Sequence, residues 1–125
     1  MLEIKGLKKR FKAKEVLKNL NFSINEGEIV CLLGNNGAGK TTLINCILRM
    51  LQADAGSIFL EGREISTYKN EEYFSKVNAL LESSVNVYDY LTGWQNIEYF
   101  SGLQNIDSGN EKIKTYISLF ELEEA

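Results

Sequence analysis

The alternation of apolar and polar positions near the N-terminus predicts two β-strands. Residues 2–11 and 15–24 both read as strands, because apolar side chains recur among polar ones along each stretch. Asn25, Glu26 and Gly27 then supply the residue types of a turn. The next stretch, residues 28–33, is a short apolar run with β-branched side chains, which is typical of a buried strand. The pattern therefore predicts an antiparallel β entrance that leads into a buried strand.

Helical spacing replaces this pattern further along the chain. After residue 40, one helix face is expected to carry Leu43, Ile44, Ile47, Leu48 and Leu51. Thr92 and Gln95 have the spacing of a capping box and predict the start of a second helix. The apolar face of that helix comprises Ile97, Phe100 and Leu103. Ser108 and Glu111 form a further capping box, which precedes an apolar stripe at Ile113, Tyr116, Ile117 and Phe120.

Between the predicted buried strand and the first helix lies a glycine-rich loop, residues 34–42, that fits the phosphate-binding P-loop pattern. Its glycines are expected to take positive φ angles and to let the backbone approach a polyphosphate. Lys40 is expected to bridge the β- and γ-phosphates, and Thr41 to place its hydroxyl on Mg²⁺. The strand, loop and helix context favours a nucleotide site over a plain glycine-rich turn. The loop consists of Gly34, Asn35, Asn36, Gly37, Ala38, Gly39, Lys40, Thr41 and Thr42.

Composition bounds the size and the chemistry of the protein. With 125 residues, 44% apolar and 25% charged, the chain has enough material for one globular domain. The absence of histidine excludes histidine-based acid–base catalysis and histidine-ligated metal sites. A net charge of −3 gives no global case for binding nucleic acid. A local basic cluster is either a solvated hairpin surface or extra positive potential near a nucleotide or an anionic surface; it comprises Lys8, Lys9, Arg10, Lys12 and Lys14.

The cysteines and the N-terminus indicate a reducing compartment. Cys31 lies in the predicted buried strand and Cys46 in the following helix, so both are expected to be small buried hydrophobes. The first residues contain no apolar core of signal-peptide length, and no apolar run is long enough to span a membrane. These features predict a cytoplasmic protein.

Two long stretches resemble the start of an ABC-type ATPase domain, namely residues 16–29 and residues 33–43. Residues 54–58 are similar to the turn that returns that family's chain to a strand after the P-loop helix. Residues 79–82 and 91–97 resemble its Q-loop region and the helix that follows. The resemblance implies an α/β fold: a P-loop NTPase core with an antiparallel β entrance, as an incomplete ABC ATPase domain over residues 1–125. A β-rich entrance with the P-loop strand is expected at 1–33, and the P-loop with its helix at 34–51. Strands with the Q-loop region are expected at 52–91, and the start of a helical subdomain at 92–125.

The resemblance also implies roles for residues near the loop. Phe11 occupies the place of an aromatic residue that stacks on adenine, the alternative being a half-buried strand aromatic. Val16 would pack against the same base or sugar, and Thr42 would contact the α-phosphate. Glu82 stands where the family most often has glutamine, and with Lys40 it is a candidate catalytic residue. A carboxylate there can ligate Mg²⁺; the alternative is that Glu82 merely ends a strand.

Glutamate at this position resembles one branch of exporters. The resemblance therefore implies an ATPase subunit that binds Mg-ATP and powers export, peripheral on the inner face of the cell membrane. Its expected partners are a transmembrane permease, with interface candidates Tyr88, Tyr90 and Trp94, and a second ATPase domain in a homodimer or heterodimer. No nucleic-acid partner is expected.

Several family motifs are not found along the chain. An aspartate–glutamate pair ending an apolar strand, a Leu-Ser-Gly-Gly-Gln-like segment and a switch histidine are all missing. We therefore expect this chain to be the N-terminal portion of the family's ATPase domain, without turnover by itself. The alternative is a truncated, non-hydrolysing nucleotide-binding or regulatory module. A GTPase or small kinase is a third interpretation, which the β entrance argues against. Without the missing strands, residues 29–33 should lack partners and expose sheet edges.

Overall fold

The two N-terminal strands and two further strands build a small antiparallel sheet with one helix packed on it. The structure is a computed structural model that describes residues 1–81, 87–107, 109 and 111–121. It divides into two units, Met1–Asn78 and Ala79–Ala125, each described by itself below.

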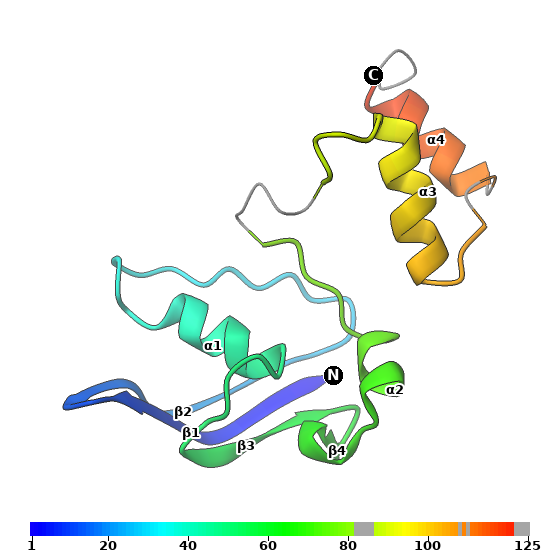
Figure 1. The fold of residues 1–125 in the computed structure, drawn as a ribbon. Helices are drawn as coiled ribbons and strands as arrows, with labels where there is room; N and C mark the ends of the chain where they lie inside the picture. The colour runs from blue at the N-terminus through cyan, green and yellow to red at the C-terminus, as the bar shows by residue number, and fades with distance from the viewer. Residues whose placement is uncertain (82–86, 108, 110, 122–125) are drawn as a thin grey trace. The chain divides into compact units, whose positions relative to one another are not determined.

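Both predicted N-terminal strands are confirmed. Strands β1 (Leu2–Phe11) and β2 (Lys14–Ile24) pair as an antiparallel hairpin. On its other side β1 pairs with β3 (Ala55–Leu60), which in turn pairs with the short β4 (Arg63–Glu64). The sheet order is therefore β2-β1-β3-β4, with all neighbours antiparallel (Figure 1).

Helix α1 (Lys40–Ile47) supplies the other half of the core of this unit. Leu43 and Cys46 on α1 are buried together with sheet residues that face the same way, so the helix covers one face of the sheet (Figure 1). The core is completed by a 3₁₀ turn (Ile65–Thr67) and by the short helix α2 (Asn70–Phe74). Its buried members are Ile4, Leu7, Leu17, Leu43, Cys46, Ile58, Ile65, Tyr68 and Tyr73.

The prediction of a buried strand at residues 28–33 is wrong for this structure. The stretch pairs with no strand among the described residues, and Ile29 and Leu33 are 95% and 91% exposed. Cys31, expected to be buried, is exposed for the same reason. A strand forms only when neighbouring strands take up its backbone N–H and C=O groups. The sheet that the described residues form places no such neighbour beside this stretch, as expected for residues 29–33 in the absence of partner strands.

The second unit contains helices α3 (Gly93–Leu103) and α4 (Glu111–Leu119). The capping box predicted at the start of α3 is confirmed: Gln95 N donates to Thr92 Oγ1 at 3.2 Å, and Thr92 N donates to Gln95 Oε1 at 2.9 Å. Ser108, the cap predicted for α4, lies outside the described residues. Among the helices that the structure describes, none has the length and apolar character needed to cross a membrane.

Candidate nucleotide site

The glycine-rich loop joins the exposed stretch to the N-terminus of α1, and its backbone uses glycine in two different ways. Gly37 and Gly39 have φ angles of 80° and 98°, in the left-handed region that other residues avoid. The predicted positive φ at Gly34 is wrong, because Gly34 is not among the residues with left-handed backbone. A Cβ on Gly34 would lie 3.2 Å from Cβ of Ala38, so this glycine provides space where the loop closes on itself.

Lys40 begins α1 and directs its ammonium group back into the loop. Its Nζ donates to the carbonyl oxygens of Gly34 at 2.6 Å and Asn35 at 3.0 Å. Leu43 N donates to Gly39 O at 2.8 Å, which starts the helix at the last loop glycine. The loop therefore combines a positive charge with the N-terminal end of a helix, where backbone N–H groups attract anions.

The other predicted loop residues differ in how they are exposed. Asn35, Asn36 and Ala38 are exposed, and Ala38 N already donates to Asn35 O at 3.1 Å within the loop. Thr41 is exposed and Thr42 is half-buried in the first turn of α1. The Thr41 hydroxyl is therefore reachable by a ligand at the helix start.

The β1–β2 hairpin lies beside the loop. A Cβ on Gly39 would lie 3.0 Å from Cγ1 of Val16, so β2 packs closely against the start of α1. A Cβ on Gly37 would lie 3.9 Å from Nζ of Lys14, which places one member of the basic cluster next to the loop. Phe11 is opposite Lys14 in the hairpin and is 46% exposed. The structure thus brings Phe11 and Val16 to the hairpin end that flanks the loop, and their contact with a nucleotide stays a prediction.

Glu82, the second candidate catalytic residue and a predicted Mg²⁺ ligand, lies outside the described residues. Within the part of the chain that the structure describes, no three His, Cys, Asp or Glu side chains gather into a possible metal site. Mg²⁺ commonly uses one or two protein ligands together with substrate phosphates and water. The exposed hydroxyl of Thr41, next to Lys40, fits that role.

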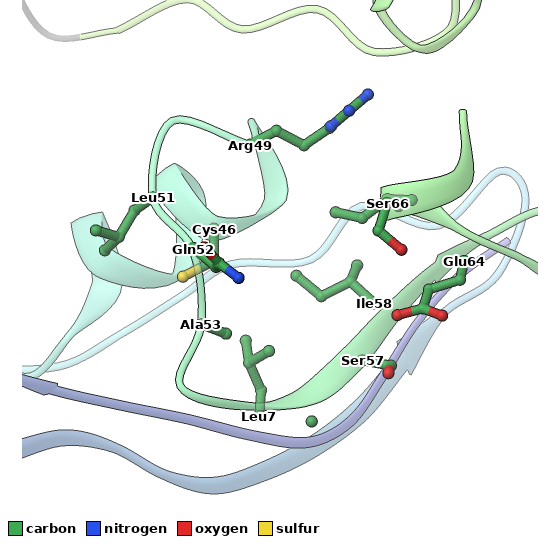
Figure 2. A pocket seen from close by; sticks show the side chains of 12 residues that line it. Leu7, Cys46, Arg49, Leu51, Gln52, Ala53, Ser57, Ile58, Glu64 and Ser66 are labelled. Carbon is green, nitrogen blue, oxygen red and sulfur yellow. The ribbon is translucent and has the colours of Figure 1, made fainter. Parts of the chain in front are cut away.

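A separate hollow lies under the other end of α1. Its volume is about 340 Å³, and Figure 2 shows that Cys46 of α1, Leu7 of β1 and Ile58 of β3 line it together with Arg49. Arg49 Nη1 donates to Tyr68 O at 3.2 Å, and its guanidinium lies 5.3 Å from the ring centre of Tyr73. None of residues 34–42 lines this hollow, so it is distinct from the predicted nucleotide site.

Sequence reasoning missed an ion pair near the C-terminal end of β1. Lys9 Nζ lies 2.7 Å from Oδ1 of Asp54, and Oδ2 of Asp54 accepts a hydrogen bond from Arg10 N at 2.7 Å. The hydrogen bond from Lys9, followed by that from Arg10, holds the pKa of the Asp54 carboxyl below its ordinary value. In the sequence, only the basic cluster pointed to this ion pair. Asp54 is distant from Lys9 along the chain, and the pairing of β3 with β1 brings the two side chains together.

Three comparisons with known proteins match the chain to one family. The family model described as ABC transporter matches residues 17–125. The uncharacterized ABC transporter ATP-binding protein YdbJ of Bacillus subtilis is 40% identical over 103 residues, which cover 82% of this chain and 33% of that protein. The methionine import ATP-binding protein MetN of Legionella pneumophila is 32% identical over 126 aligned positions, covering 98% of this chain and 37% of MetN.

A solved structure described as the ATP binding subunit of an ABC transporter superposes with a TM-score of 0.73 at 29% identity. The match covers 85% of this chain and 43% of that one. The chain thus spans about a third of the length of the two curated relatives and less than half of the solved structure.

Proposed function

Since the chain belongs to the ABC transporter family, we propose that residues 34–42 bind ATP together with Mg²⁺. One observation carries the proposal: the ammonium group of Lys40 points into a loop that Gly37 and Gly39 shape at the N-terminus of α1. A polyphosphate is the ligand that such a loop suits, because its charge is met by the ammonium group and by the N-terminal end of the helix.

Individual roles follow from position. Lys40 binds the β- and γ-phosphates, exchanging the carbonyl oxygens of Gly34 and Asn35 for phosphate oxygens. Thr41 supplies a hydroxyl to Mg²⁺, and Thr42 contacts the α-phosphate from the same helical turn. Phe11 and Val16 face the adenine and the sugar, which their place beside the loop supports.

For the whole protein, we propose ATP hydrolysis coupled to membrane transport, with Lys40 and Glu82 in the catalytic site. The partners are a permease subunit and a second ATPase domain, and the protein works at the inner face of the membrane. The export direction expected from Glu82 finds no support among the relatives, since MetN is named as an import protein. The proposal therefore covers transport and assigns no direction.

Substitution of the loop lysine tests the proposed site. In Lys40→Ala we expect ATP affinity to fall by roughly tenfold to a hundredfold, because hydrogen bonds from a charged donor to phosphate are lost. Titration with a fluorescent ATP analogue in the presence of Mg²⁺ measures the change. The matched control is Lys18→Ala, which removes an exposed lysine from β2. Equal ATP affinity in Lys40→Ala and Lys18→Ala would refute the proposed phosphate site.

A further inference from the structure

The attachment of β1 to β3 ends just before the predicted base-stacking residue. Ladder pairing between these strands stops at Lys8 and Ala55. Asp54 then continues the attachment with its own groups: its backbone N donates to Lys8 O at 2.9 Å, and its Oδ2 accepts from Arg10 N at 2.7 Å. A single aspartate thus secures the strand as far as the residue that precedes Phe11.

The same carboxylate also holds a cation over the ring of Phe11. Oδ1 of Asp54 lies 2.7 Å from Nζ of Lys9, whose side chain is only 14% exposed. That ammonium lies 5.8 Å from the centre of the Phe11 ring, within the range of a cation–π interaction. Asp54, Lys9 and Phe11 therefore form a continuous set of contacts from the end of the β3 ladder to the hairpin tip.

Such a set of contacts matters because Phe11 is not part of the hydrophobic core of this unit. The ring is 46% exposed and lies next to the hairpin turn at Lys12 and Ala13. An exposed aromatic side chain that samples several rotamers loses conformational entropy when a base stacks on it. A ring that Lys9 already holds in place loses less conformational entropy when the base stacks on it, so the nucleotide binds more tightly. An aspartate is ionised at neutral pH, and the hydrogen bonds from Lys9 and Arg10 lower the pKa of Asp54 further, so its carboxylate is available to pair with Lys9.

We propose that Lys9 and Asp54 are positioning residues for Phe11 and strengthen binding of an adenine nucleotide without touching it. This inference rests on the proposed function, in which Phe11 stacks on the base. It predicts that the pair affects ligands that carry a base and leaves the phosphate loop unchanged.

The test compares ATP with inorganic triphosphate on variants of the full chain. Lys9→Met keeps the length of the side chain and removes its charge, and we expect ATP to bind about two- to fivefold more weakly. Triphosphate, which has no base, should bind unchanged. Asp54→Asn should behave in the same way, because it retains an oxygen for Arg10 N and loses the ion pair with Lys9.

The control is a pair of the same kind on the same strand. Lys5 lies 2.9 Å from Oε2 of Glu3 and 5.1 Å from the ring centre of Phe59, remote in register from the hairpin tip. Lys5→Met should leave the affinity for both ligands unchanged. A loss in Lys5→Met equal to that in Lys9→Met would mean that any such pair on β1 acts through general stability, and would overturn the inference.

Phe11→Ala separates the inference from the proposed function. If Phe11→Ala weakens ATP binding and Lys9→Met and Asp54→Asn do not, the inference fails and the proposed site stands. If Lys9→Met weakens ATP and triphosphate equally, the pair has a structural role and the inference also fails.

The expected result is that Lys9→Met has no further effect on ATP affinity in the Phe11→Ala background, since the ring that Lys9 positions is gone. Failure of the proposed function would instead appear as unchanged triphosphate binding in Lys40→Ala.

Discussion

At the scale of single residues, the two cysteines lie in opposite environments. Cys46 is 3% exposed in the core beneath α1, and burial raises the pKa of its thiol. Cys31 is exposed in the stretch that precedes the glycine-rich loop. The thiolate is the reactive form of cysteine. Burial therefore protects Cys46 from electrophiles in two ways: reagents cannot reach the sulfur, and the raised pKa keeps the thiol protonated.

We therefore expect iodoacetamide to modify Cys31 in the native chain about tenfold faster than Cys46, or more. Mass spectrometry of peptides after timed quenching measures the two rates separately. In the Cys31→Ser control only the slow reaction should remain, and denaturant should make Cys46 as reactive as an unfolded thiol. Similar rates for both cysteines in the native chain would contradict the burial of Cys46.

At the scale of elements, α3 is anchored by an asparagine whose importance the sequence did not reveal. Asn96 is 8% exposed, and its Oδ1 accepts from Tyr88 N at 2.7 Å. Its Nδ2 lies within 3.2 Å of the carbonyl oxygens of Tyr88, Leu91 and Thr92. The amide thereby joins the segment before α3 to the first turns of the helix, in addition to the capping box.

Asn96→Asp should destabilise this unit by about 1–3 kcal/mol, because a carboxylate oxygen replaces a donor that faces carbonyl oxygens. Trp94, the one tryptophan of the sequence, lies in α3, so its fluorescence during urea unfolding reports the change. The control Glu98→Gln makes the reverse exchange on the exposed side of the helix and keeps an acceptor for Trp94 Nε1. An equally small effect of both substitutions would show that the Asn96 contacts contribute little.

At the scale of the whole molecule, residues 29–33 form an apolar segment that the described residues leave largely uncovered. Ile29 and Leu33 are the most exposed, and Val30 and Leu32 are 47% and 40% exposed. Apolar segments with free backbone groups favour pairing with another chain.

The chain by itself should consequently be marginally stable, oligomeric or domain-swapped. Sedimentation velocity over a range of concentrations is expected to show self-association, and Leu33→Asp should shift the distribution toward monomer. Met50→Asp, at another exposed apolar side chain of the same unit, serves as the control and should leave the distribution unchanged. A concentration-independent monomer with a sharp cooperative melt would refute this prediction.

The sequence by itself determined the features that depend on neighbours along the chain. Alternation predicted β1 and β2, helical spacing predicted the burial of Leu43, and the spacing of Thr92 and Gln95 predicted the cap of α3. The glycine-rich loop could be recognised for the same reason: backbone shape, lysine and helix start are all encoded within nine consecutive residues.

Only the tertiary structure decided the features that depend on distant partners. The apolar composition of residues 28–33 predicted a strand, but a strand requires paired neighbours, and the described sheet offers none to this stretch. Asp54 meets Lys9 across 45 positions of sequence because β3 returns alongside β1. Local patterns state what a segment can become, whereas the positions of its partners in space decide which backbone groups are paired and which side chains are buried.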